Sequence, residues 1–292
     1  MKKRVLIISY YWPPSAGSGV QRWLKFSKFL PEHGYEPHVY TPLNPSFDLR
    51  DEELLADVSD QVVVVKRKIT EPYALFKLFG GKKKGNTGLV NSDKKKSKFD
   101  QWSSWIRGNL FIPDPRVFWV KPSVKFLSQY VKEHRIDVVI TTGPPHSMHL
   151  IGQGVKERTG IRWVVDMRDP FSKLDFLDTY SITDKNKKKY AKMEQDILNQ
   201  CDHVLATSSS MPELLMPFDK NKFTCITNGF DPDDFPEKPA SINREQFVVY
   251  HAGLLNSVRN PVQLWQAIRE LLSENPDWAS SWKMLSEPVP NQ

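Results

Sequence analysis

Apolar runs and helical stripes alternate along most of the chain. The first is the continuous apolar segment from Val5 to Tyr10, which predicts a buried parallel strand because such a strand is covered on both faces. Residues 20–33 then place apolar side chains near helical spacing and stop at Gly34, a typical helix end. Further strands are expected at 36–41, 61–65, 137–142, 162–167, 203–207 and 222–227, with helices at 117–134, 147–158 and 188–200 and a short one after Ser210.

This alternation indicates a fold class. A helix that joins two parallel strands crosses one face of their sheet, and the crossover is right-handed. We therefore expect an α/β fold, a Rossmann-like parallel sheet with helices on both faces, over residues 1–235. Within this domain, residues 66–115 lose the pattern, and we interpret them as a basic and aromatic insertion that forms a mobile, solvated loop.

The pattern changes a second time near residue 236. A Pro-containing segment over 236–246 predicts a linker, after which residues 247–251 favour a new first strand and residues 260–273 favour a helix. The Trp- and Pro-rich residues 278–292 do not resemble the next strand. One strand and one helix cannot bury a sheet face, so we expect residues 247–292 to be the incomplete start of a second Rossmann-like domain.

Composition narrows the class of protein. The chain is 39% hydrophobic, 12% aromatic and 26% charged, as in folded globular proteins, and no apolar run reaches the roughly 20 residues of a spanning helix. The basic start, Met1 to Arg4, is followed by a short apolar run without a small-residue cleavage site, so we expect a cytoplasmic protein. Cys201 and Cys225 lack metal-ligand spacing, so neither a disulfide nor a metal site is expected.

The net charge of +7 is localised. Residues 77–107 contain nine basic and two acidic residues, which accounts for the whole excess, so we expect no nucleic-acid partner. In the same stretch Trp102, Trp105 and Ile106 have the spacing of an amphipathic helix, and residues 80–111 are a candidate contact with an anionic membrane surface. The alternative is a loop whose aromatic residues pack on the domain, and the sequence leaves both open.

The loop after the first strand is the first candidate site. It contains Gly17, Ser18 and Gly19 and opens a helix. A glycine-rich turn there brings backbone N–H groups and the positive helix end to a phosphate. Glycines before a helix also serve the turn itself, and the glycine spacing differs from the dinucleotide fingerprint.

Two further loops follow strands on the same edge. His146 lies in a Pro-Pro-His loop before a helix, where a base or hydrogen-bond donor is useful; the alternatives are a helix cap or an exposed side chain. The strand at 162–167 ends with Asp166, followed by Arg168 and Asp169. For Asp166 we favour a structural salt bridge, whereas Arg168 and Asp169 fit either a salt bridge or recognition of a hydroxylated substrate.

The last candidate positions are Asn228 and Gly229, which end the final strand of the first domain at the crossover to the linker. Asn and Gly suit a tight turn. In order, these motifs resemble those of the family 4 retaining glycosyltransferases, and the resemblance extends to about Leu272. It is carried by the glycine loop, Pro144-Pro145-His146, Asp166-Met167-Arg168-Asp169, Ala206-Thr207-Ser208, Asn228-Gly229-Phe230-Asp231 and Tyr250-His251-Ala252-Gly253.

The resemblance implies a GT-B fold, in which this chain supplies the N-terminal acceptor-binding domain and a second domain holds most of the nucleotide-sugar donor. It places Gly17 and Gly19 against the donor diphosphate and His146 near the transferred sugar. Transfer in the family retains the anomeric configuration and needs no metal and no cofactor beyond the nucleotide-sugar. The implied acceptor is a glycan or lipid-linked saccharide in cell-surface polysaccharide synthesis, reached at the inner face of the membrane.

The end of the chain departs from the family. The family's second domain carries an Arg and Lys pair for the diphosphate and a Glu-x7-Glu motif. Of these residues, only the Arg has a counterpart in this chain, which is Arg259. We therefore expect a truncated donor domain and a chain that is inactive by itself. The alternative function is a non-catalytic nucleotide- or glycan-binding module, or a partner-docking module.

Overall fold

The structure is a computed structural model that describes residues 2–47, 49–71, 105–106, 108–173, 182–235, 247–252 and 260–287. The chain falls into two compact units, and among the described residues the boundary between them lies between Phe230 and Asp231. The first unit contains a seven-stranded sheet and the second a two-stranded sheet.

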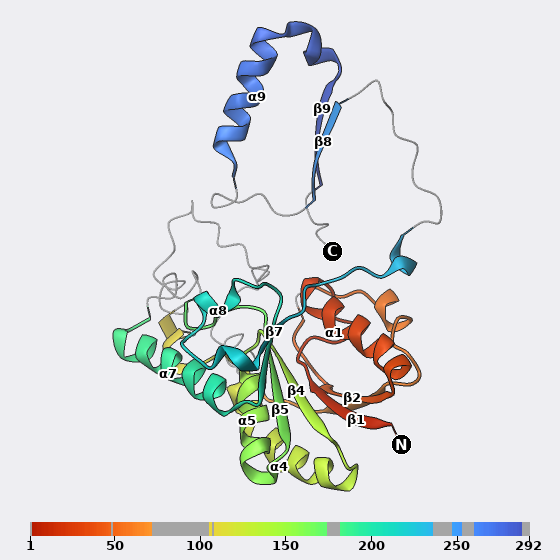
Figure 1. The fold of residues 1–292 in the computed structure, drawn as a ribbon, viewed down its shortest axis with the longest axis vertical. Helices are drawn as coiled ribbons and strands as arrows, with labels where there is room; N and C mark the ends of the chain where they lie inside the picture. The colour runs from red at the N-terminus through yellow and green to blue at the C-terminus, as the bar shows by residue number, and fades with distance from the viewer. Residues whose placement is uncertain are drawn as a thin grey trace, which may run out of the picture. The chain divides into compact units, whose positions relative to one another are not determined.

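All strands of the larger sheet are parallel, in the order β3-β2-β1-β4-β5-β6-β7 (Figure 1). The strands are β1 Lys3–Ile8, β2 Tyr35–Pro42, β3 Val63–Arg67, β4 Val138–Gly143, β5 Arg162–Met167, β6 His203–Ala206 and β7 Phe223–Cys225. The α-helices that are described in full are α1 Ser18–Phe29, α4 Val117–Glu133, α5 Ser147–Thr159, α7 Asp184–Gln200 and α8 Met211–Leu214. The Rossmann-like parallel sheet expected from the sequence is confirmed.

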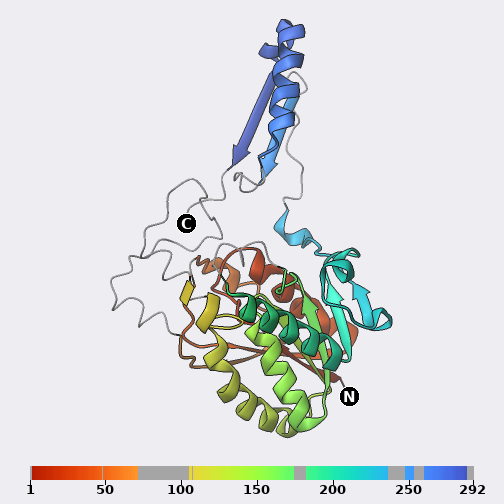
Figure 2. The same ribbon diagram turned by 90° about the vertical axis from the view of Figure 1, so that its left-hand side faces the viewer.

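Side chains of β1 point alternately to the two faces of the sheet. Val5 and Ile7 belong to one core cluster, whose members on α1 are Val20, Trp23 and Leu24. Leu6 and Ile8 belong to the other, larger cluster, whose members on α4, α5 and α7 include Trp119, Leu127, Met148, Ile151, Ile197 and Leu198. Helices therefore cover both faces, as Figure 2 shows from the side, and the apolar run is explained because Val5 to Ile8 are all buried.

Helix α5 approaches the sheet closely at Gly152. A methyl group at this position would collide with the Trp163 indole and would lie 2.5 Å from Thr141 Cγ2. The Trp163 Nε1–H in turn donates a 2.9 Å hydrogen bond to Thr141 Oγ1. These contacts fix α5 against β4 and β5, and so they fix the loop that precedes α5.

The second unit is a β-α-β element. It contains β8 Phe247–Ala252, α9 Val262–Glu274 and β9 Trp282–Glu287, and the two strands pair in parallel along their whole length. The expectation of a single strand and helix is therefore wrong, because β9 is a second strand. Lys283, Ser286 and Glu287 interrupt its apolar residues, so the segment lacks the apolar run by which the other strands were predicted.

Several boundaries differ from the predicted ones. Lys66 and Arg67 belong to β3, so the predicted insertion begins later than residue 66, and β7 ends at Cys225, two residues before the predicted end. Short 3-10 helices cover Leu30–His33, Glu53–Leu55, Lys220–Lys222, Pro232–Asp234 and Pro276–Ser280. No helix in the described ranges is both long enough and apolar enough to cross a membrane.

Candidate functional site

The order of the strands places a switch point between β1 and β4. From β1 the chain continues through α1 to β2 on one side, and after β3 it returns through α4 to β4 on the other side of β1. The segments after β1 and β4 lead to helices on opposite faces, since α1 and α5 belong to different core clusters. Ligands of open α/β sheets bind outside the carboxyl ends of the strands at such a point.

The glycine loop reaches this edge from β1. Gly17 caps α1 with φ at 91°, in the left-handed region that favours glycine, and no side chain caps the helix. A methyl group at Gly19 would lie 3.1 Å from Tyr11 Cδ2, and the Gly19 carbonyl accepts a 3.0 Å hydrogen bond from Arg168 Nη1. Ser18 is the first residue of α1, and its side chain lies outside the described part of the structure.

His146 lies at the N-terminus of α5 but neither caps the helix nor faces solvent. It is 5% exposed, makes no capping hydrogen bond, and stacks on Phe171 with ring centroids 4.5 Å apart. Both ring nitrogens lack a hydrogen-bond partner in the described structure. Burial, reinforced by His149 and the Arg168 guanidinium, lowers the pKa of His146 well below its ordinary value. The histidine is therefore neutral near pH 7, chiefly because it is buried.

A second histidine, His149, lies one turn further along α5. It is fully buried, its Nδ1 is 2.9 Å from Thr141 Oγ1, and burial lowers its pKa to about 3. Gly143 lies between the two rings. A methyl group there would be 2.7 Å from His149 Nε2 and 2.9 Å from His146 Nδ1, so only glycine leaves room for both imidazoles.

Two neutral buried histidines make stability depend on pH. In the unfolded chain each takes a proton below about pH 6.5, whereas in the folded chain His149 takes one only near pH 3. The free energy of unfolding therefore falls as the pH is lowered from 6.5 towards 3, by about 2 kcal/mol for His149 at pH 5. Between pH 7 and pH 5 the free energy of unfolding should therefore fall by about 2 kcal/mol less in His149→Asn than in the unmodified chain. Urea unfolding at both pH values measures this difference.

The matched control for this prediction is His33→Asn, at an exposed histidine in the turn before β2. Its acid-dependent loss of stability should equal that of the unmodified chain. Equal losses for all three proteins would contradict the neutral, buried state of His149.

Arg168 and Asp169 follow β5 on the same edge. Burial lowers the pKa of Arg168, an effect opposed by the carboxylates of Asp166 and Asp169, and burial raises the pKa of Asp169. Arg168 donates a hydrogen bond to the Gly19 carbonyl of the glycine loop, and its positive charge contributes to the lowered pKa of His146. The structure thus brings the loops after β1, β4 and β5 together around one cationic side chain.

Behind these loops lies a buried ion pair. Asp166 is 0% exposed and accepts hydrogen bonds from Arg22 Nε and Nη2 on α1, at 3.2 and 3.0 Å. Trp23 Nε1 and Thr142 Oγ1 donate to its other oxygen at 2.7 and 2.9 Å. The structural interpretation of Asp166 is therefore confirmed. Arg22 was not predicted as a site residue, because nothing near it in the sequence indicates that it is buried.

The crossover residues attach to the same arginine. Arg22 Nη1 donates to the Asn228 side-chain oxygen at 3.1 Å and to the Thr227 carbonyl at 3.3 Å. Gly229 is exposed and a methyl group there would meet nothing within 4 Å. Asn228 thus contacts the ion pair, whereas Gly229 makes no contact that requires glycine.

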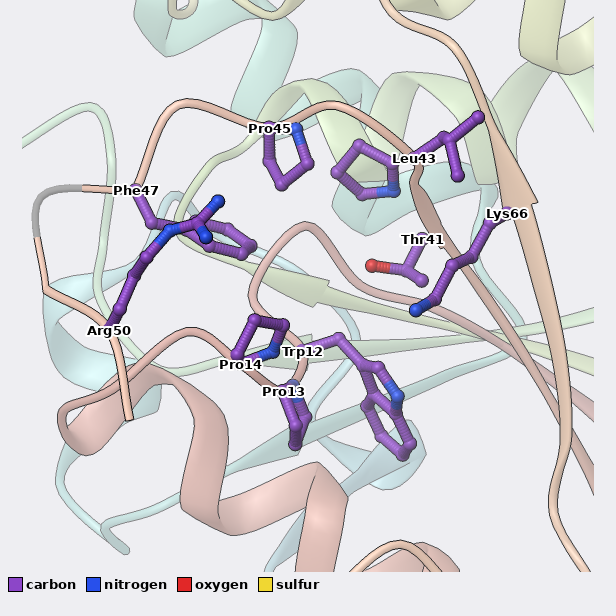
Figure 3. Close-up of a pocket in the computed structure, with 10 residues that line it drawn as sticks. Trp12, Pro13, Pro14, Thr41, Leu43, Pro45, Phe47, Arg50 and Lys66 are labelled. Carbon is purple, nitrogen blue, oxygen red and sulfur yellow. The ribbon is translucent and has the colours of Figure 1, made fainter. Parts of the chain in front are cut away.

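A small pocket opens on the neighbouring part of this edge, over β1, β2 and β3 (Figure 3). Its volume is about 150 Å³. The lining consists of Trp12, Pro13, Pro14, Thr41, Pro42, Leu43, Pro45, Phe47, Arg50 and Lys66, and none of the predicted site residues belongs to it.

The remaining predictions fall on other parts of the chain. Arg259, the linker 236–246 and most of the candidate membrane segment 80–111 lie outside the described residues. Of that segment, Trp105 and Leu110 are described and exposed. Across the described ranges, no three His, Cys, Asp or Glu side chains lie close enough to hold a metal ion.

The model of Glycosyltransferase Family 4 matches residues 87–234, half of the chain, and no curated protein matches the sequence. Among solved structures, the α,α-trehalose 6-phosphate synthase from Burkholderia multivorans has a TM-score of 0.50 at 10% identity, covering 99% of this chain and 64% of that one.

Two further solved structures show lower similarity. The glycosyltransferase from Rickettsia africae ESF-5 has a TM-score of 0.44 at 12% identity, over 99% of this chain and 69% of that one. Sucrose-phosphate synthase from Thermosynechococcus elongatus has a TM-score of 0.47 at 10% identity, and the match covers 98% of this chain and 71% of that one. At such identities the similarity concerns the fold.

Proposed function

Because the chain belongs to glycosyltransferase family 4, we propose that it contributes to sugar transfer from a nucleotide-sugar to the hydroxyl group of a glycan or lipid-linked saccharide. In this reaction the bond from the anomeric carbon to the diphosphate breaks and a bond to the acceptor oxygen forms. Cell-surface polysaccharide synthesis is the process that uses acceptors of this kind.

The observation that supports the proposal is the arrangement of the glycine loop, Arg168 and His146 at the switch point between β1 and β4. Gly17 opens α1 with a backbone conformation that suits glycine, Gly19 is bonded to Arg168, and Arg168 lies close enough to His146 to lower its pKa. A helix N-terminus and a guanidinium stabilise the negative charge that develops on a departing diphosphate. The proposed transfer therefore needs no metal ion, and it retains the anomeric configuration as in the rest of the family.

His146 suits contact with a sugar. A neutral imidazole offers one donor and one acceptor, and a sugar hydroxyl is both an acceptor and a donor. Its two nitrogens have no partner among the described residues, and buried polar atoms without partners are costly. A hydroxyl of the transferred sugar would satisfy them, and we assign His146 this role.

The donor remains to be identified by experiment. We expect one of the UDP-, GDP- or ADP-sugars, or its free diphosphate, to raise the melting temperature of the chain by several degrees at about a hundred times its Kd, which stabilises by about 2.7 kcal/mol. Gly17→Val should abolish the shift, because valine is strained at positive φ and its side chain stands where the phosphate approaches. His146→Ala should reduce the shift for the sugar nucleotide more than for the free diphosphate.

Gly34→Val is the matched control, since Gly34 also has positive φ and lies beside open space at the far end of α1. It should lower the melting temperature and keep the donor-induced shift. If no donor shifts the melting temperature, the proposed donor contact at the glycine loop is refuted. Release of nucleoside diphosphate in the presence of glycan or lipid-linked acceptors would exclude the non-catalytic binding module.

A further inference from the structure

The pocket over β1, β2 and β3 has a cationic rim. Arg50 and Lys66 are its ionisable lining residues, and its lining includes no Asp or Glu. Lys66 makes no hydrogen bond or ion pair with the described residues. The Arg50 guanidinium makes a long ion pair, 3.8 Å, with the exposed Glu52 carboxylate. Figure 3 shows both cationic side chains at the rim on opposite sides, with the Lys66 ammonium directed inwards. Two such groups favour one anion between them.

The rest of the pocket is apolar with one hydroxyl. Proline rings, Trp12, Leu43 and Phe47 form the walls, and the Thr41 oxygen points into the space between them (Figure 3). Thr41 is 2% exposed, so a group that reaches its hydroxyl is largely surrounded. Apolar walls with a few placed polar groups are typical of ligand sites. The volume is below the range for a whole drug-sized ligand, so the pocket fits a single ring.

The walls are held in place by hydrogen bonds between the loops. Ala16 N–H donates to the Leu49 carbonyl at 3.2 Å, and Asp51 N–H donates to the Pro14 carbonyl at 2.9 Å, so the loop after β1 is tied to the Arg50 segment. The opposite wall is tied by Leu43 N–H to the Arg67 carbonyl at 2.8 Å. A pocket whose walls are fixed before binding loses less conformational entropy when it is filled.

A buried charge cluster supports the loop that carries Pro45 and Phe47. Glu71 accepts the Ser46 N–H at 3.0 Å and the Tyr10 hydroxyl at 2.7 Å, and Arg116 Nε lies 3.1 Å from the same carboxylate. Arg116 therefore offsets the charge of Glu71, and this acid does not neutralise the cationic rim.

We propose that this pocket binds an acidic sugar of the acceptor, with the ring against Trp12 and the prolines and its carboxylate or phosphate between Arg50 and Lys66. The inference rests on the proposed function and names the class of acceptor. Because β1 lies between β2 and β4, the pocket and His146 occupy neighbouring stretches of one sheet edge. An acceptor whose acidic sugar fills the pocket thus extends towards the loop after β4.

The test is direct binding to the full chain, followed through the indole N–H resonance of Trp12 and assigned with Trp12→Phe. Glucuronate and glucose 6-phosphate should shift this resonance with an affinity about tenfold higher than that of glucose, the range of one or two charge-assisted hydrogen bonds. Inorganic phosphate alone should bind more weakly than glucose 6-phosphate, because it makes no contact with the apolar walls.

Lys66→Met and Arg50→Gln should each lower the affinity for the two acidic sugars about tenfold and leave that for glucose unchanged. Lys68→Met is the matched control, an exposed lysine close to the pocket that does not line it, and it should have no effect. Equal affinities for glucose and the acidic sugars, equal affinities for phosphate and glucose 6-phosphate, equal losses in Lys68→Met, or no binding at all would each overturn the proposal.

These outcomes are separable from the proposed function. Donor binding that Gly17→Val abolishes, together with a pocket that shows no preference for acidic sugars, leaves sugar transfer standing and removes the acidic acceptor. Acidic-sugar binding without any donor binding supports the pocket and refutes the donor contact at the glycine loop.

Discussion

Asp166→Asn is expected to lower the free energy of unfolding by about 3–5 kcal/mol, as measured by urea denaturation followed through tryptophan fluorescence. The substitution keeps the shape of the side chain and removes its charge. Arg22 then remains as a buried cation without a counterion, and the amide nitrogen of asparagine faces one of the donors now held by the carboxylate, from Arg22, Trp23 or Thr142.

Asp169→Asn is the matched control at the neighbouring loop position. Its carboxylate is half-buried, and burial raises its pKa, so the ionised form is already disfavoured and its removal should cost less than about 1 kcal/mol. Equal losses in the two variants would contradict the ion pair as the main tie between α1 and β5.

A double-mutant cycle separates the pair from its surroundings. Arg22→Met removes the cation, so Asp166→Asn should cost clearly less in that background than in the unmodified chain. Since Arg22 also binds Asn228 and α1 carries the glycine loop, both single variants should weaken donor binding as well. Additive losses would show that the two side chains do not interact.

The order of strands and helices in the first unit could be predicted from the sequence, because strands covered on both faces are apolar at every position. Val5 to Ile8 are such a run, and each of its side chains is buried in one of the two core clusters. The strand β9 could not be predicted in this way, since polar residues interrupt it.

The candidate site was only partly predictable. A strand that ends in a buried aspartate requires a partner, and this requirement was visible at Asp166, but the partner Arg22 is 144 residues away in the sequence, on α1. The burial of His146 depends on Phe171, which packs over it from another loop. The pocket is built from the loops after β1 and β2 and from the ends of β2 and β3, so no local pattern indicates that Arg50 and Lys66 share it.

Once the donor, and any partner that the chain needs for transfer, are known, Gly143→Ala is expected to reduce the rate of nucleoside diphosphate release by about a hundredfold, because a displacement of about 1 Å in a positioned group has an effect of that size. The added methyl group would lie within 3 Å of both His149 Nε2 and His146 Nδ1. His149 is fully buried and hydrogen-bonded to Thr141, so the ring of His146 is the one that must move. Gly143 and His149 thus act as positioning residues for His146.

Overpacking alone also costs stability, about 1–3 kcal/mol, and Gly154→Ala separates this cost from the effect on the site. A methyl group at Gly154 would lie 2.7 Å from Val124 Cγ2 on α4 and would touch neither histidine. It should lower the melting temperature to a similar extent and leave the rate unchanged. Because His149→Ala frees the space that the methyl group needs, Gly143→Ala should cost far less rate in that background. A hundredfold loss that persists there would show that the strand end, not the His149 ring, transmits the effect to His146.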